Sequence, residues 1–242
     1  MNPLQISAYA RCVGQRNKTD KLDALLLARF GERECPPFWA PPEALMMELR
    51  ALLREVRHIK KQLGREVARL QSAPLCVQAV IAECVAFWQG ALARVQAQVM
   101  AFIEGSAVLK ARARLLLSVP GVGEKTVPFL LAYLGDGSGF ESAKKVASFA
   151  GLAPKLHESG TSVRAKARIG SYGKAVLREA LFMPALVVSF GRYRAFVPFV
   201  ERLLASGKRR KEIVIAVMRK ILTVAYGVLK SGKPYDKMRH AV

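Results

Sequence analysis

A helical repeat runs through the segment Leu45-Met-Met-Glu-Leu-Arg-Ala-Leu-Leu-Arg-Glu-Val-Arg-His-Ile-Lys-Lys-Gln-Leu-Gly-Arg-Glu-Val-Ala-Arg-Leu70. Its apolar residues recur at steps of four and three, at Leu45, Leu49, Leu52, Val56, Ile59, Leu63, Val67 and Leu70. This spacing is the heptad pattern of a coiled coil, because residues about 3.5 positions apart lie on one side of a helix. The segment therefore predicts one long helix with a single apolar face.

The same pattern resumes after Pro74 and predicts a second helix. Apolar residues there fall at Val77, Ile81, Cys84, Trp88, Leu92, Val95, Val99 and Phe102. Two such helices joined by a short turn predict a long antiparallel coiled-coil hairpin over residues 43–106, with arms of roughly 40 Å. A two-helix arm buries its apolar faces poorly by itself, so we expect it to pair with a second copy or to lie along its own domain. An ordinary helical bundle within one domain is the alternative.

The flanking segments complete a mainly α fold in four parts. Residues 1–35 read as short helical pieces, one of which is expected to begin at Thr19 or Asp20 and to end at Gly31. Residues 36–42 contain four prolines and predict a stiff linker. Beyond the hairpin, residues 107–242 form the last part, with helices expected at about 174–190, 193–205 and 209–231.

The charge of the chain points to a polyanionic partner. The formal net charge is +21, and residues 155–242 hold 19 Lys or Arg against 5 Asp or Glu. Such an imbalance is typical of nucleic-acid-binding proteins, although a generically basic, solvated surface is the alternative. The four cysteines form no CxxC pair and no signal peptide is visible, so we expect a cytoplasmic protein with no membrane segment, associated with the nucleoid.

A glycine turn, Val119-Pro-Gly-Val-Gly123, lies between two apolar helical segments and has the form of a helix-hairpin-helix. Gly121 and Gly123 permit backbone angles that other residues avoid. Backbone N–H groups at the start of the next helix would then meet a phosphate, with help from Lys125 and Thr126. A glycine turn used purely for packing is the alternative.

The segment from Gly151 to Gly170 combines hydroxyl and cationic side chains. Ser159 stands in a glycine context, and Arg164, Lys166 and Arg168 follow at alternating positions, which share one face of an extended strand. A hydroxyl beside fixed cations suits attack on a phosphodiester, because the cations stabilise the charged transition state. A plain phosphate-binding loop is the alternative. His157 is a candidate base, although a histidine near a serine is usually incidental.

A pair of carboxylates, Asp20 and Asp23, lies three positions apart, so that a helix places both on one face. Hard oxygen ligands of this kind suit Mg²⁺. Acids in the first helical turn serve equally well as caps and dipole partners, which is the alternative. Two carboxylates are also too few for a two-metal nuclease site.

Several of these elements occur in the order found in one family. They are Asn2-Pro3, Lys18-Thr-Asp-Lys-Leu-Asp-Ala24, the hairpin, Pro120-Gly-Val-Gly123, Phe149-Ala-Gly-Leu-Ala-Pro154, Ser159-Gly160, Met218-Arg-Lys220 and Gly232-Lys-Pro-Tyr-Asp236. The chain thus resembles the insertion-sequence one-ten family of bacterial transposases, which pair a DEDD RuvC-like domain with a serine-bearing transposase domain. The resemblance covers nearly the whole chain.

The resemblance implies a role for each part. Asp20 and Asp23 would be the last two acids of a Mg²⁺ site in a RuvC-like α/β remnant, residues 1–35, and Ser159 would be the nucleophile of the transposase domain. The partners would be donor and target DNA, a guide RNA, and a second copy or higher oligomer through the hairpin. Lys174 and Arg178 are further candidates for nucleic-acid contact.

The family's first two acids precede the Asn-Pro element, and the sequence has no counterpart before Met1. We therefore expect a truncated metal domain that holds Mg²⁺ weakly, and reduced or absent activity. A non-catalytic DNA- or RNA-binding protein that uses the glycine turn and the basic C-terminal region is the alternative function.

Overall fold

The computed structural model describes residues 3–36, 38, 43–159, 163–170 and 172–237, and the side chains of residues 155–168 lie outside this description. The chain divides into two compact units, Met1–Glu43 and Ala44–Val242. The described residues are mainly helical, as the sequence predicts, with one two-stranded sheet. Most of the predicted linker, residues 37 and 39–42, lies outside the described residues.

The first unit consists of α1 (Pro3–Cys12) and α2 (Asp20–Glu34). Thr19 caps α2, because its side chain accepts a hydrogen bond from the backbone N–H of Leu22 at 3.3 Å, and this start is as predicted. The predicted end at Gly31 is wrong, because the helix continues to Glu34. A glycine inside a helix costs only about 1 kcal/mol relative to alanine, whereas Pro36 prevents continuation of the helix.

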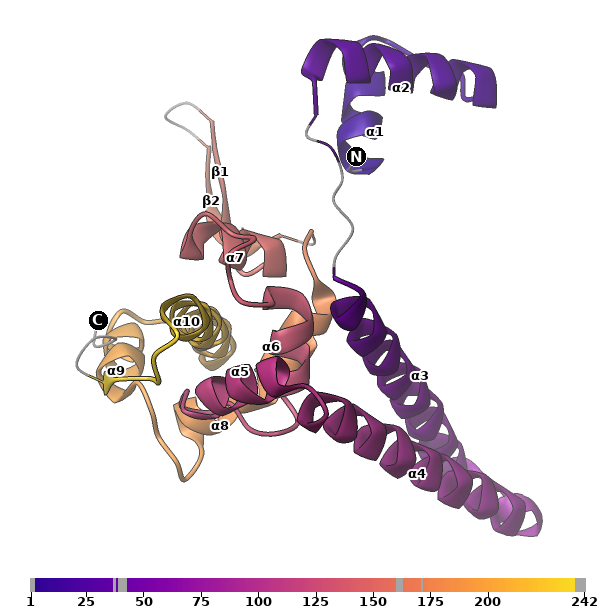
Figure 1. Ribbon diagram of the computed structural model, residues 1–242. Helices are drawn as coiled ribbons and strands as arrows, with labels where there is room; N and C mark the ends of the chain where they lie inside the picture. Colours follow the sequence, from indigo (N-terminus) through magenta and orange to yellow (C-terminus); the bar gives the residue numbers. More distant parts are fainter. Residues whose placement is uncertain (1–2, 37, 39–42, 160–162, 171, 238–242) are drawn as a thin grey trace. The chain divides into compact units, whose positions relative to one another are not determined.

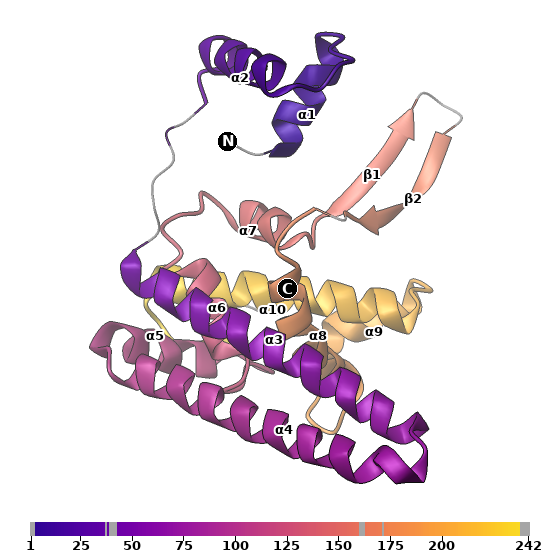
Figure 2. The same cartoon turned by 90° about the vertical axis from the view of Figure 1, so that its right-hand side faces the viewer.

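The two predicted long helices are present as α3 (Ala44–Ser72) and α4 (Leu75–Glu104). They are joined by two residues and run back along each other, as Figures 1 and 2 show. At ~1.5 Å per residue, 29 and 30 residues give arms of roughly 45 Å, close to the predicted length. Pro74 immediately precedes α4, where a missing N–H has no cost.

The predicted apolar seam is used within the chain. Its residues near the open end of the hairpin belong to the core of the second unit, among them Leu49, Val56, Val99 and Ile103. Farther out, Ile81 and its neighbours are buried between the two helices alone. The hairpin therefore lies along its own domain at the root, and the predicted boundary at residues 106 and 107 falls inside one compact unit.

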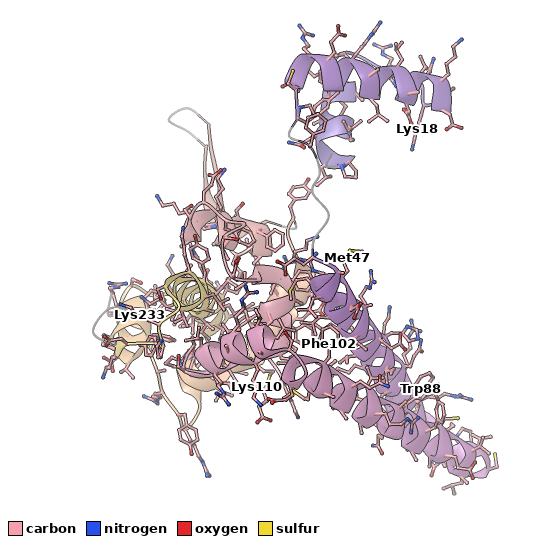
Figure 3. The ribbon with its side chains drawn as sticks, viewed as in Figure 1. Lys18, Met47, Trp88, Phe102, Lys110 and Lys233 are labelled. Carbon is pink, nitrogen blue, oxygen red and sulfur yellow. The ribbon has the colours of Figure 1, made fainter. Side chains whose placement is uncertain are left out.

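Two polar contacts fix the root of α3. Arg50 Nε donates to the carbonyl oxygen of Ala132 at 2.7 Å. Arg57 makes a bidentate pair with Glu179, with N–O distances of 2.8 and 2.9 Å. Figure 3 labels Phe102, which packs against the core, and Trp88, which lies farther out along the arm.

The outer side of α4 is apolar and exposed. Leu75, Val80 and Phe87 have exposed fractions of 85%, 62% and 61%. By length and composition alone, α4 is the one helix among the described residues that is able to cross a membrane. This is weak evidence for a span, because α3 runs beside α4 with seven Lys or Arg along its length.

The core of the second unit surrounds α6 (Val127–Leu134) and α10 (Arg210–Ser231). Every residue of α6 except Tyr133 is buried, and α10 packs against four other helices. These are α5 (Ala107–Leu117), α7 (Ala143–Ala150), α8 (Ala175–Phe190) and α9 (Val197–Ala205). Helices α8 and α10 match their predicted ranges within one residue.

Helix α9 begins four residues later than the predicted start at position 193. Phe196 precedes it with a left-handed backbone, at φ 56°, which interrupts any helix extending from the N-terminal side. A loop therefore connects α8 to α9, and Tyr193 in that loop is 83% exposed.

A β hairpin projects beside α7, formed by β1 (Pro154–Ser159) and β2 (Val163–Ile169). The strands pair antiparallel, from Pro154 opposite Ile169 to Ser159 opposite Val163. Strand β2 contains the extended segment expected from Arg164 to Arg168. Its partner β1 is not predicted by the sequence, because Lys-Leu-His-Glu-Ser lacks the alternation of a half-buried strand.

Candidate nucleic-acid interface

Ser159 is the last residue of β1, and the loop that follows it, residues 160–162, lies outside the described structure. Its backbone pairs with Val163, and the next pair is Glu158 with Arg164. The candidate nucleophile thus stands at the far end of the hairpin, next to the strand that carries the three alternating cations. The candidate base His157 pairs through its backbone with Ala165, and the side chains of His157 and Ser159 lie outside the described structure.

The base of the β hairpin is a close crossing of two backbone segments. A Cβ atom on Gly151 would lie 2.3 Å from the carbonyl oxygen of Tyr172. A Cβ atom on Gly173, whose φ is +117°, would lie 2.4 Å from the nitrogen of Gly151. Only glycine fits at either position. The hairpin is therefore anchored by backbone contact at its base.

Two predicted nucleic-acid contacts, Lys174 and Arg178, lie at this crossing. Arg178 Nη1 donates to the carbonyl oxygen of Ala150 at 2.9 Å. Lys174 donates its backbone N–H to Phe149, and its ammonium group lies 5.7 Å from the centre of the Phe149 ring. Lys174 is exposed. Arg178 thus holds the hairpin base together, and Lys174 presents a cation beside it.

The glycine turn between α5 and α6 is tightly packed on one side. Gly121 has φ +84°, and a Cβ atom there would lie 2.7 Å from Val188 Cγ1 on α8. Thr126 is buried, and its N–H and that of Val127 already donate to the carbonyl oxygen of Gly123 at 2.8 and 3.1 Å. These contacts favour the packing role for Gly121 and Thr126.

Gly123 and Lys125 remain accessible in the same turn. A Cβ atom on Gly123 would meet no heavy atom within 4 Å, and Lys125 is exposed. Because Pro128 has no N–H and the two preceding N–H groups are used, the first turn of α6 offers few backbone donors. A phosphate at this turn would depend on Lys125 and on the N–H groups before Thr126.

The candidate metal ligands Asp20 and Asp23 lie in the first turn of α2, in the other compact unit. Among the described residues, no group of three or more His, Cys, Asp or Glu side chains is gathered as a metal site requires. Mg²⁺ prefers six oxygen ligands and sheds its water reluctantly, so these two carboxylates by themselves do not make a fitting site. Both acids also suit the N-terminal end of the helix dipole.

A groove of about 910 Å³ lies at the base of the β hairpin, between it and helices α9 and α10. The paired residues Pro154 and Ile169 line one side. Apolar side chains of the two helices, including Phe199, Leu203 and Ile215, form the floor. Four cations also line the groove, namely Lys208, Lys211, Arg219 and Lys220.

Sequence reasoning did not select this groove, although α10 carries a signal for it. Lys211, Ile215 and Arg219 are four positions apart, so the helix puts them on one face. Burial lowers the pKa of Lys220, and the nearby Arg202 guanidinium lowers it further. The groove thus holds at least one partly desolvated cation, Lys220, which lies near the second cation Arg202.

Comparison with known proteins covers both compact units. Residues 113–197 match the family described as Transposase IS116/IS110/IS902 family, and residues 1–74 match a transposase family of the DEDD IS110 type. The chain is 46% identical over 240 residues to the pilin gene-inverting proteins of Moraxella lacunata and Moraxella bovis, covering 99% of its own length and 74% of theirs. It is 31% identical over 141 residues to an uncharacterized protein of insertion element IS110 from Streptomyces coelicolor, covering 58% of this chain and 33% of that protein.

Proposed function

Because the chain belongs to the IS110 family of transposases, we propose that it is a DNA recombinase that cuts and rejoins the ends of a mobile or invertible DNA segment. The observation that carries this proposal is the 46% identity to two gene-inverting proteins, which extends over both compact units. The positive charge of the chain supports it, because a recombinase must hold a polyanion.

Ser159 is the proposed nucleophile. Its Oγ forms a bond to phosphorus, the bond from phosphorus to one sugar oxygen breaks, and that sugar leaves as a hydroxyl carrying the serine proton. Charge accumulates on the phosphoryl oxygens in this transition state, and Arg164, Lys166 and Arg168 on the neighbouring strand are the cations proposed to stabilise it. A projecting hairpin suits this role, because it can reach the DNA backbone.

Two further parts of the proposal rest on the family resemblance. Asp20 and Asp23 are proposed as two of the ligands of a divalent metal, and they need further ligands to make a site. A guide RNA is proposed as the partner that selects donor and target DNA. Lys125, Lys174 and Arg178, with Gly121, Gly123 and Thr126 of the glycine turn, stay proposed contacts to nucleic acid.

A second copy of the chain is the proposed partner of the helical hairpin formed by α3 and α4. The inner faces of α3 and α4 are used within the chain, so the contact would use the exposed side of α4 around Val80 and Phe87. Exposed apolar patches with few charges are typical of protein interfaces.

The test of the catalytic proposal is covalent capture of DNA. The 242-residue chain is incubated with donor DNA, candidate guide RNA and Mg²⁺, and the protein is separated on a denaturing gel. Because Asp20 and Asp23 need further ligands to hold Mg²⁺, we expect at most a weak protein–DNA adduct with the unaltered chain and with the control variant Ser162→Ala, and none with Ser159→Ala. Adducts that persist in Ser159→Ala exclude Ser159 as the nucleophile.

A non-catalytic nucleic-acid-binding protein is the second candidate. The basic groove between the base of the β hairpin and helices α9 and α10 favours it, because that groove can bind a polyanion without any nucleophile. Nucleic-acid binding without adduct formation in the same assay supports this candidate.

A further inference from the structure

The groove beside α10 is lined by cationic and by apolar side chains. Arg219 and Lys220 are partly buried, and Lys208 and Lys211 are exposed at its edge. Among the lining residues that the structure describes, Glu212 is the one acid, and its carboxylate accepts the backbone N–H of Arg209 at 2.8 Å as the cap of α10. The described walls of the groove therefore carry more positive than negative charge.

The cations of the groove favour an anionic occupant. Burial and the nearby Arg202 lower the pKa of Lys220, which means that its charged form is less favourable here than in water and gains from a counter-ion. An anion placed among Lys211, Arg219 and Lys220 removes this penalty. The volume of about 910 Å³ lies within the range of roughly 300–1,000 Å³ that is typical of sites for drug-sized ligands, so a nucleotide fits.

The apolar floor of the groove favours an unpaired nucleotide over a DNA duplex. Phe199, Leu203 and Ile215 face the groove, and the Arg202 guanidinium lies 5.4 Å from the centre of the Phe199 ring. A DNA duplex presents phosphates on its outside and keeps its bases stacked inside, so such a floor would have nothing to contact. An unpaired nucleotide has both an apolar base and a charged phosphate.

We propose that this groove binds an unpaired nucleotide of a DNA strand, with its base on the floor formed by Phe199, Leu203 and Ile215 and its phosphate among Lys211, Arg219 and Lys220. The floor favours DNA over RNA, because a buried 2′-hydroxyl needs a partner. Among the described lining residues, Thr223 supplies the one side-chain hydroxyl, and its Oγ1 already donates to the carbonyl oxygen of Lys220 at 3.0 Å.

This inference rests on the proposed recombinase function, because a strand break exposes unpaired nucleotides beside it. The groove begins at Pro154, and Ser159 lies five residues along β1 from that point. At about 3.3 Å per residue, the two are roughly 17 Å apart along the strand. The groove would hold the strand near the break while the far end of the hairpin reaches the scissile phosphate.

The experiment measures binding of the full chain to a labelled oligo-dT of about 30 nucleotides and to a labelled duplex of the same length by fluorescence anisotropy over a range of salt. The groove variant is Arg219→Gln with Lys220→Gln. The control variant, Lys61→Gln with Arg65→Gln on the exposed side of α3, removes the same charge elsewhere. Circular dichroism checks that each variant is folded.

For the single strand, we expect the slope of log affinity against log salt to become shallower by about 0.7 in the groove variant, because losing the one phosphate proposed to lie among Lys211, Arg219 and Lys220 reduces the slope by roughly that amount. The control variant and the duplex slope should not change. Phe199→Leu should weaken oligo-dT binding about fivefold or more while leaving the duplex unaffected, because base–aromatic stacking contributes about 1 kcal/mol or more.

Equal weakening of both DNA forms, or no effect of the groove variants, overturns the inference but leaves nucleic-acid binding in place. Tighter binding of oligo-rU than of oligo-dT overturns the choice of DNA. If the unaltered chain binds no nucleic acid at low salt, the proposed function itself fails. Ultraviolet crosslinking of the unaltered chain to bromouracil-substituted DNA adds a readout independent of variants, and crosslinked peptides should come from residues 197–223. Crosslinks confined to other regions contradict the inference.

Discussion

At the scale of single residues, glycine carries much of the structure near the proposed site. Gly151 and Gly173 allow two backbone segments to cross where no Cβ atom fits, and Arg178 closes the crossing with a hydrogen bond to Ala150. The β hairpin that carries Ser159 is therefore oriented by residues at its base that take no part in the proposed reaction. Substitutions at this crossing should therefore alter the position of Ser159, although none of these residues is the proposed nucleophile.

Gly173→Ala should destabilise the fold by roughly 2–4 kcal/mol, because its Cβ would collide with the backbone of Gly151 at a strained positive φ. Urea unfolding followed by circular dichroism measures the change. The matched control is Gly64→Ala on the exposed side of α3, where nothing lies within 4 Å. This control should stabilise the chain by about 0.5–1 kcal/mol. If Gly173→Ala is as stable as the unaltered chain, the close backbone contact between Gly151 and Gly173 is contradicted.

Lys220→Met should raise the free energy of unfolding by up to about 1 kcal/mol while weakening nucleic-acid binding, because the charged lysine is unfavourable in its partly buried position beside Arg202. The folded-state pKa of Lys220 lies below its ordinary value of 10.5, so the penalty is present at neutral pH. It is relieved as pH rises through the folded pKa, because the unfolded chain then binds the proton more tightly.

The measurement for Lys220 is the difference in unfolding free energy between the variant and the unaltered chain. This difference should shrink between neutral pH and about pH 10. A difference that grows with pH would mean that Lys220 is stabilised by an acidic partner, contrary to its described surroundings.

At the scale of elements, the hairpin of α3 and α4 has two unlike sides. The inner side packs within the chain, and the outer side of α4 exposes large apolar residues in its first half, from Leu75 to Phe87. Replacement of Val56 with a charged residue would disrupt the core, so it would not test whether a second copy of the chain binds. An interface test must use the outer side.

Val80→Glu combined with Phe87→Glu should convert a dimer to a folded monomer, since positions seven apart lie on the same side of α4. Multi-angle light scattering measures the mass. Tyr193→Glu, at another exposed aromatic position outside the hairpin, is the control and should stay dimeric. The proposal of a second copy fails if the unaltered chain already has the mass of one chain.

At the scale of the whole molecule, charge is the dominant property. A net charge of +21 on 242 residues repels itself, and nucleic acid is the partner proposed to offset this repulsion. Affinity for DNA should fall by roughly 10³-fold or more between about 50 and 200 mM salt if six or more phosphates are contacted. Anisotropy titrations at several salt concentrations measure this fall. An affinity that does not change with salt would contradict the proposal that the chain binds nucleic acid through phosphate contacts.

The sequence predicted the long helices well, because heptad spacing and proline positions act locally. Helices α3, α4, α8 and α10 lie close to their expected ranges, and Thr19 caps α2 as expected. The end of α2 was harder to predict, because Gly31 is a weak stop signal and Pro36 a strong one. The start of α9 depends on Phe196, whose left-handed backbone no sequence rule indicates.

The candidate site was predictable in part. The glycine turn and the cations of β2 stand out in the sequence, and Gly121 proves to be packed against Val188. The groove was not predictable, because its floor comes from α9 and its cations mainly from α10, while its other side comes from the hairpin base about 50 residues earlier. Only the packing of these three segments brings their residues together.

The packing of the helical hairpin has a consequence for how the chain opens. Near the root, Leu49, Val56, Val99 and Ile103 are part of the main core, so separating the helices there means unfolding the whole unit. Toward the tip, each helix is held by the other alone, and Val67 is already 37% exposed. The tip can therefore fray and re-form at a small fraction of the global unfolding free energy. A protease should nick the folded protein near residues 70–76 and leave the root, the core and the groove intact.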